Sequence, residues 1–169
     1  LRKHSGALAC YRKVMMLTGG QWTPGFHSNF SNLLNDLGQH KEALQHSKIA
    51  TKGAPDDKSI QLNHALLLRD MKRFPDSMKE FDALVADAPD DARLQWNRAF
   101  TQLYTGLSQD AWDAFEWRWD AKMLPVPTVA AKAQRWKGEN LEGKRLVLTR
   151  EQGFGDTMLM VRYLPMVKK

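Results

Sequence analysis

The sequence predicts an all-α protein, an α-α superhelix of stacked helix pairs, followed by a short C-terminal α/β stub. Two observations predict the superhelix: a motif that recurs at a fixed interval, and apolar side chains spaced to lie on one side of a helix. The stub is predicted by a short apolar run that precedes a glycine-containing loop near the end of the chain.

The repeat is seen most clearly in the segments "APDDKS" at 54–59 and "APDDAR" at 88–93. Pairs of identical residues that lie 34 positions apart, an interval we call the repeat period, are Pro55 and Pro89, Gln61 and Gln95, and Ala65 and Ala99. A fixed period of this length is typical of stacked helical hairpins. We therefore expect repeats over 1–120, as a partial unit 1–23 and full units 24–57, 58–91 and 92–120.

Each full unit is predicted to form two helices. In the first helix of the middle unit, one stripe suited to burial contains Ile60, His64, Leu67, Leu68 and Met71. Asp57 and Asp91 directly precede first helices, where a short carboxylate can accept from free backbone N–H groups. The second helices, "KEALQHSKIATKG", "PDSMKEFDALVADA" and "QDAWDAFEWRWDAK", carry a small residue at one shared position, where we expect the paired helices to cross closely: Ala43, Ser77 and Ala111.

This pattern resembles the tetratricopeptide repeat (TPR) family over residues 24–120, with these residues in place: Pro55, Ala65, Pro89, Gly106, Ala111 and Phe115. Upstream, "GALACYRKVMM" is similar to the second helix of a further unit, with Ala7 at the small position. His64 and Arg98 stand where the family usually has Leu, so the helix contacts there are expected to be locally polar.

In a superhelix of this kind the first helices line an inner groove. The predicted groove residues are Gly25, Asn29, Asn32 and Asp36, then Ser59, Asn63, Leu66 and Asp70, then Arg93, Asn97, Phe100 and Tyr104. Asn29, Asn63 and Asn97 recur once per repeat, and an amide offers a donor and an acceptor that match a peptide bond. Such an asparagine ladder resembles the repeat domain of O-linked N-acetylglucosamine transferases, which implies a protein or peptide partner.

Two other interpretations of these positions stay open. Asn is also compatible with a role in helix packing at this place in the repeat. A chaperone-binding clamp is similar in having polar residues where Asn32, Asn63 and Arg93 lie, but Ser28 and Asn97 stand where that clamp has cations. Without those charges, most of the electrostatic attraction for a peptide carboxylate is lost.

Beyond the repeats, "AWDAFEWRW" is expected to form an apolar helix face from Trp112, Phe115 and Trp119. Residues 121–143 are predicted to be a linker, because Pro125 and Pro127 prevent a helix, with one buried anchor at Trp136.

The segment 144–169 is predicted to start a truncated Rossmann-like domain. "KRLVLTR" predicts a strand, and a helix is expected to begin near Asp156. The loop between them contains Gly153 and Gly155, which permit close approach of the backbone to a ligand, and the amides at the start of the helix favour an anion. The string over about 116–165 resembles the junction, in bacterial proteins, between tetratricopeptide repeats and a glycosyltransferase domain. That resemblance implies that Asp156 is a general base in an intact parent enzyme, whereas within this chain Asp156 is equally a helix cap and no catalysis is expected.

Composition excludes several functions. Basic residues give a net charge of +6 but form no block, which argues against nucleic acid, and no apolar run approaches the roughly 20 residues of a membrane span. The single Cys10 indicates a reducing, cytoplasmic compartment, and the five histidines lack metal-ligand spacing. We expect no metal and no cofactor, with a nucleotide-sugar only in an intact parent. The alternative function is a stand-alone TPR scaffold or adaptor without an enzymatic connection.

Overall fold

The computed structural model describes residues 2–20, 22–123, 133–149 and 153–167. The chain divides into a repeat domain, Leu1–Ala121, and a C-terminal segment, Lys122–Lys169. The repeat domain contains α1 (Arg2–Leu17), α2 (Pro24–Asp36), α3 (His40–Gly53), α4 (Lys58–Asp70), α5 (Phe74–Asp87), α6 (Ala92–Thr105), α7 (Gln109–Phe115) and the 3-10 helix η1 (Glu116–Arg118). The C-terminal segment contains α8 (Phe154–Val161) and α9 (Leu164–Val167).

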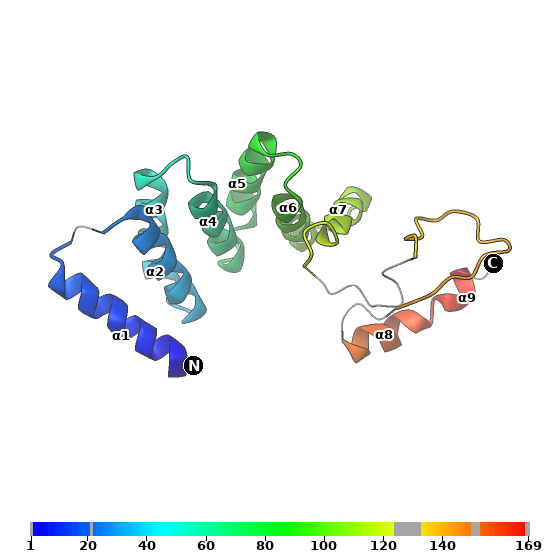
Figure 1. Cartoon of the computed structure of the whole chain (residues 1–169), viewed down its shortest axis with the longest axis horizontal. Coiled ribbons are helices and arrows are strands. Elements are labelled where there is room, and N and C mark those ends of the chain that lie inside the picture. The colour runs from blue at the N-terminus through cyan, green and yellow to red at the C-terminus, as the bar shows by residue number, and fades with distance from the viewer. Residues whose placement is uncertain (1, 21, 124–132, 150–152, 168–169) are drawn as a thin grey trace. The chain divides into compact units, whose positions relative to one another are not determined.

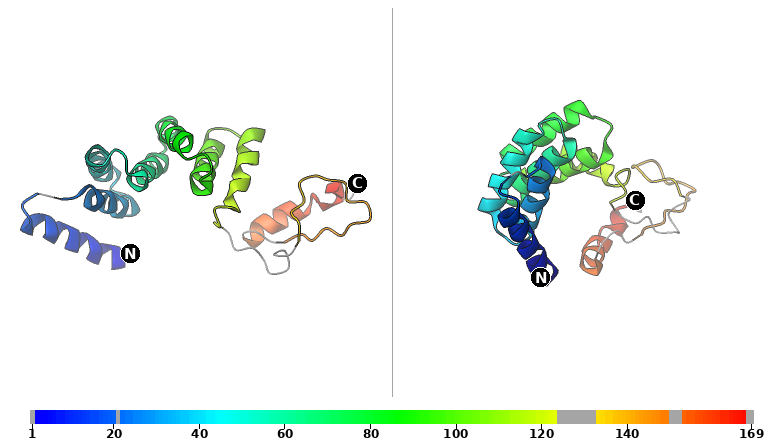
Figure 2. Two further views of the ribbon diagram at one scale, coloured as in Figure 1. Left: turned by 45° about the horizontal axis from the view of Figure 1, so that its top comes forward. Right: turned by 60° about the vertical axis from the view of Figure 1, so that its left-hand side comes forward.

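Within the repeat domain, helices pair in chain order. α2 packs on α3, α4 on α5 and α6 on α7, and each pair contacts the next through α3 with α4 and α5 with α6. Figure 1 shows these helices following one another in a row, and Figure 2 shows the same succession from two further directions. The predicted all-α helical repeat is therefore confirmed.

The first helices begin where short polar side chains cap them. The carboxylate of Asp57 accepts from the backbone N–H groups of Ser59 at 2.9 Å and Ile60 at 3.2 Å. Asp91 makes the same two bonds at the start of α6. These bonds satisfy donors that a helix end otherwise leaves free, as the sequence predicts.

The recurring glutamines explain part of the repeat. Gln95 donates from its side-chain amide to the carbonyl of Pro89 at 2.8 Å, and Gln61 donates in the same way to Pro55. α4 and α6 are thus each fastened to the turn that precedes them. The fixed repeat period preserves this contact from one unit to the next.

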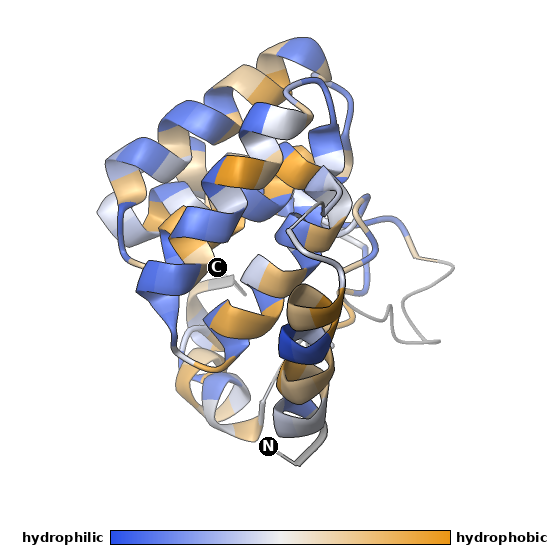
Figure 3. Ribbon diagram, turned by 90° about the vertical axis from the view of Figure 1, so that its left-hand side faces the viewer, coloured by the Kyte–Doolittle hydropathy of each residue, from blue (hydrophilic) through white to orange (hydrophobic). Residues whose placement is uncertain are grey.

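The core lies between the helices in two clusters. One contains Phe30, Leu34 and Leu67, with Tyr11 of α1 packed against it, and the other is built around Phe81. In Figure 3, apolar and polar stretches alternate along the helices, as expected when each helix buries one side. The predicted small positions Ala43, Ser77 and Ala111 are all fully buried.

The polar contacts expected at two repeat positions are present. The ring of His64 lies 2.7 Å from the hydroxyl of Ser47, between α4 and α3. Arg98 of α6 pairs with the carboxylate of Asp82 of α5 at 2.6 Å. Where the family usually has Leu, this chain therefore joins its helices by hydrogen bonds and an ion pair.

The end of the repeat domain differs from the prediction. We expect a helix through 109–122, but α7 ends at Phe115 and a 3-10 turn follows. Trp112 is 48% exposed, so it does not join a buried apolar face. The buried side chain is instead Arg118, which donates to the carbonyl of Phe115 at 3.2 Å and lies 4.8 Å from the ring of that residue. This bond accompanies the change from α-helix to 3-10 turn.

The predicted α/β stub is wrong for the part of it that the structure describes. Residues 144–149 form no strand, and Val147 and Leu148 are both more than half exposed. A strand needs a neighbour for its backbone hydrogen bonds, and the described residues contain none. The linker residues 124–132 and the loop residues 150–152 lie outside the described part of the chain.

Two further predictions in the C-terminal segment need correction. Trp136 is not a buried anchor, because it is 38% exposed and its indole N–H donates locally to the carbonyl of Glu139 at 2.7 Å. α8 begins at Phe154 with Gly153 as its N-cap, so Asp156 lies in the first turn and is not the cap. No helix in the described part of the chain is long and apolar enough to cross a membrane.

Candidate functional site

The predicted groove residues lie on α2, α4 and α6, and we call the surface they form the first-helix face. These helices bury a different stripe, such as Ile60, Leu67 and Leu68 of α4. The predicted groove residues range from exposed to buried. The exposed ones are Gly25, Asn29, Asp36, Ser59, Asp70, Arg93 and Tyr104, the half-buried ones are Asn32, Asn63, Leu66 and Phe100, and Asn97 is buried.

The three asparagines of the predicted ladder have different environments. Asn29 is exposed, whereas the amide of Asn63 donates across to the hydroxyl of Ser28 on α2 at 3.1 Å. Asn97 is only 4% exposed, and it donates to the carbonyl of Arg93 at 2.9 Å. The accessibility of the amides therefore falls from the first repeat to the third.

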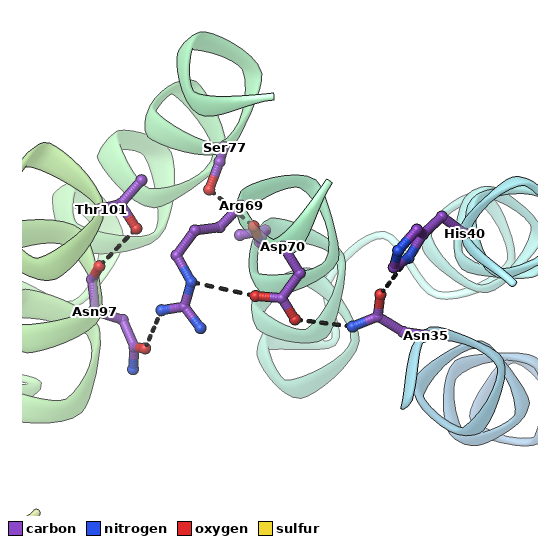
Figure 4. A network of polar contacts seen from close by, with 8 residues as sticks. Asn35, His40, Arg69, Asp70, Ser77, Asn97 and Thr101 are labelled. Carbon is purple, nitrogen blue, oxygen red and sulfur yellow. Dashed lines mark hydrogen bonds and ion pairs between the residues drawn. The ribbon is translucent and has the colours of Figure 1, made fainter. Parts of the chain in front are cut away.

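A polar network joins the three first helices, and Figure 4 shows it. Arg69 donates to the side-chain oxygen of Asn97 at 3.2 Å and lies 3.5 Å from the carboxylate of Asp70. Asp70 accepts from the amide of Asn35 at 2.8 Å, and Asn35 in turn lies 2.9 Å from the ring of His40. The network therefore fixes the side chains of Asp70 and Asn97 on the first-helix face.

Two members of this network, Asn35 and Arg69, are absent from the predicted site. Each directly precedes an aspartate of the first-helix face, and the two are separated by one repeat period. The repeat period alone would have identified them as equivalent positions. Their contacts would have stayed hidden, because those contacts run between neighbouring repeats.

The first-helix face becomes aromatic at α6. Tyr104 is 58% exposed, and its ring is parallel to that of Phe74 at 5.3 Å, with an angle of 8° between the planes. Phe100 meets Tyr104 edge-on at 5.3 Å, and the guanidinium of Arg69 lies 5.4 Å from the centre of the Phe100 ring. An amide-bearing surface at α2 thus gives way to a fixed aromatic surface at α6.

The interior histidines hold the helix pairs together. His27 of α2 and His46 of α3 are 6% and 8% exposed, and their Nδ1 atoms are 2.7 Å apart. Burial lowers the pKa of both rings, and the charge of His27 lowers that of His46 further. Burial also lowers the pKa of His64. The described residues contain no group of three or more side chains that could hold a metal ion.

The C-terminal loop residues lie on an open surface. Gly153, Gly155 and Asp156 are all exposed, and a methyl group added at Gly155 would meet no neighbouring atom within 4 Å. The backbone of Gly153, with φ of −58°, is one that any residue adopts. In the described residues, the geometry therefore gives neither glycine a special role.

The architecture of this chain is similar to that of a known protein. No family model matches the chain. The crystal structure of YrrB, a TPR protein with an unusual peptide-binding site, superposes with a TM-score of 0.60 at 18% sequence identity, over 72% of this chain and 62% of YrrB. The chain has a tetratricopeptide-repeat fold.

A curated relative also matches in sequence. Protein FlbA of Caulobacter vibrioides is 37% identical over 68 residues, which are 40% of this chain and 11% of FlbA. The matched region is thus about a tenth of the length of FlbA. The match to YrrB likewise covers less than two thirds of that chain.

Proposed function

We propose that this chain is a TPR interaction module whose first-helix face binds an extended segment of a partner protein. The observation that carries the proposal is the accessible surface shared by equivalent positions of successive first helices. This face presents the amides of Asn29 and Asn63, the partly accessible side chains of Leu66 and Phe100, and the exposed ring of Tyr104. YrrB, which shares the fold, is itself described as having a peptide-binding site, and this supports the proposal.

The three asparagines take different parts in this proposal. The exposed amide of Asn29 donates to and accepts from the peptide backbone. One N–H of the Asn63 amide donates to Ser28. Its carbonyl oxygen and second N–H bind the ligand. Asn97 acts indirectly, because its oxygen holds Arg69 against the neighbouring repeat. The direct contribution of the asparagines to peptide binding is therefore largest toward the N-terminal end of the first-helix face.

The test is a binding measurement with a peptide selected from a random library of extended sequences. Asn29→Ala and Asn63→Ala should each weaken binding by roughly 2- to 13-fold, the equivalent of one net hydrogen bond. Asn140→Ala changes an exposed amide in the C-terminal segment and is the matched control. Unchanged affinity of the Asn29/Asn63 double variant, with circular dichroism showing intact helices, would contradict the proposal.

We further propose that these repeats recruit an acceptor or a partner for a glycosyltransferase in a longer parent protein. The support is the resemblance of 116–165 to the junction of such proteins, and the position of Asp156 in the first turn of α8 after Gly153. In such a parent Asp156 would act as general base on the acceptor hydroxyl and the rest of the domain would bind the nucleotide-sugar, so this chain alone is not proposed to be an enzyme.

Reading the coding sequence beyond Lys169 tests the second proposal. Continued alternation of strands and helices with a nucleotide-sugar site is the expected result. A stop codon there would favour the stand-alone scaffold or adaptor instead.

A further inference from the structure

We propose that the bound peptide carries basic side chains, held along the C-terminal ends of the first helices by Asp36, Asp70 and Tyr104. This inference rests on the proposed function, that the first-helix face binds an extended peptide, and it adds the chemistry of the ligand. We call these three residues the cation edge. Two kinds of observation support it independently, the carboxylates and the exposed ring.

The repeat places the members of the cation edge in one row. Each is separated from the next by one repeat period, and each lies at or next to the end of its helix. Asp36 is the last residue of α2 and Asp70 is the last residue of α4. The C-terminal end of a helix carries a partial negative charge, which adds to the charge of each carboxylate. The first two full repeats therefore place a carboxylate at the same helix end, and the third places the ring of Tyr104 at the equivalent position.

The carboxylate of Asp36 is available to a ligand. Its side chain is 61% exposed, and the ring of His4 lies 3.8 Å from it. A pair this exposed contributes little stability, so a ligand cation can replace it at small cost.

The carboxylate of Asp70 is held in position and remains accessible. Asn35 donates to one oxygen at 2.8 Å and Arg69 lies 3.5 Å from the other, yet the side chain is still 43% exposed. A carboxylate has about four acceptor positions, so these two neighbours leave room for a donor from the ligand. Figure 4 shows Asp70 between Asn35 and Arg69.

Tyr104 supplies a different attraction for the same chemical group. Its ring is more than half exposed, and the parallel ring of Phe74 and the edge of Phe100 hold it in place. A Lys or Arg side chain within about 6 Å of such a ring is attracted electrostatically to its face. An acidic peptide would be repelled by Asp36 and Asp70. A purely apolar peptide would form no ion pair with either carboxylate.

The cations nearest the edge in sequence have different roles. Arg69 is bound to Asn97 and Asp70, and Arg73 pairs with Asp76 at 2.7 Å. Lys72 is exposed in the turn after α4 and therefore opposes a ligand cation. Removal of that charge with Lys72→Gln should strengthen binding of a basic peptide by about 2-fold, which is the effect expected from one exposed charge interaction.

The experiment uses the whole chain and three short labelled peptides in which Ala alternates with Lys, Gln or Glu. Fluorescence anisotropy at low salt measures their affinities. The Lys peptide should bind roughly tenfold more tightly than the Gln peptide and the Glu peptide most weakly, because two exposed ion pairs and one ring contact together contribute on the order of 1 to 2 kcal/mol.

Variants locate the effect on the cation edge. Asp36→Asn and Asp70→Asn keep the shape of the side chain and should each weaken Lys-peptide binding by about 2- to 5-fold, and Tyr104→Leu should do so by about 2- to 5-fold. Asp56→Asn neutralises an exposed aspartate in the turn before α4 and is the matched control. Affinity of Asp36→Asn/Asp70→Asn equal to that of the control would overturn the inference.

The outcomes separate this inference from the function on which it rests. Equal affinity for the Lys and Gln peptides, with both weakened by Asn29→Ala, would overturn the cation edge and leave the peptide-binding face intact. A Lys peptide whose binding responds to neither Asn29→Ala nor the aspartate variants would overturn both. No binding of any of the three would overturn the cation edge, and the library-selected peptide then decides whether the face binds peptides.

Discussion

Helices of the repeat domain and of the C-terminal segment differ in what their apolar side chains contact. Phe30 and Phe81 of the repeat domain are fully buried, whereas Phe154 and Met158 of α8 are 73% and 72% exposed. α8 is rich in apolar residues, but among the described residues the close helix pairings lie in the repeat domain. Packing between repeats therefore stabilises these helices more than helix propensity does.

The largest expected effect comes from removing a buried ring. Phe81→Ala should lower the free energy of unfolding by about 3 to 5 kcal/mol, because it leaves a cavity in the second core cluster. Phe154→Ala removes the same ring from an exposed position of α8 and should change that free energy by less than about 0.5 kcal/mol. Urea unfolding followed by circular dichroism measures both, and similar losses would remove the contrast between the two regions.

A second substitution tests the close crossing of paired helices. Ala43 of α3 is fully buried at the position that is small in every unit, so Ala43→Leu should destabilise the repeat domain by about 1 to 3 kcal/mol through overpacking. Ala86→Leu adds the same atoms at an exposed position of α5. The midpoints of urea unfolding should separate the two variants, and a neutral Ala43→Leu would show that the helices can move apart freely.

A third substitution addresses the capped starts of the first helices. Asp57→Ala removes the acceptor of two backbone N–H groups and should cost about 1 kcal/mol of stability. Asp56→Ala changes the adjacent exposed aspartate and controls for charge. Equal thermal midpoints for these two variants would be inconsistent with the capping role.

The smallest expected effect on stability comes from lowering the pH. Burial lowers the pKa of His27, His46 and His64 below the value of about 6.5 expected in an unfolded chain. The unfolded chain therefore takes up protons first as the pH falls, so the free energy of unfolding of the repeat domain should decline from about pH 7 toward pH 5. The C-terminal segment contains no histidine and lacks this dependence.

Urea unfolding at a series of pH values measures this decline. The His27→Phe/His46→Leu double variant, which replaces both rings of the buried pair, should show a shallower slope. A slope equal to that of the unaltered chain would contradict the role given to the pair.

Much of the fold follows from the sequence because spacing determines which residues share a helix side. The caps at Asp57 and Asp91 and the small positions at Ala43 and Ser77 are local or periodic features, and the structure contains them. The strand expected at 144–150 is wrong over the described residues 144–149 because an apolar run alone does not provide a partner strand.

Less of the candidate site than of the fold can be predicted from the sequence. Register correctly places Asn29, Asn63 and Asn97 on equivalent turns, but it does not reveal that Asn97 is buried. Nor does it reveal the contact with Arg69, which reaches across from the preceding repeat. Likewise, α7 ends early at Phe115, where Arg118 bonds to the backbone, and neither feature leaves a periodic signal.

The first-helix face is proposed to be the binding surface of this chain. The most direct test is to map backbone amide chemical shifts by NMR with and without the Lys-containing peptide. We predict that the changes gather on α2, α4 and α6, around Asn29, Asn63, Asp70 and Tyr104. Changes confined to Gly153–Asp156 and α8, with the first helices unaffected, would contradict the claim.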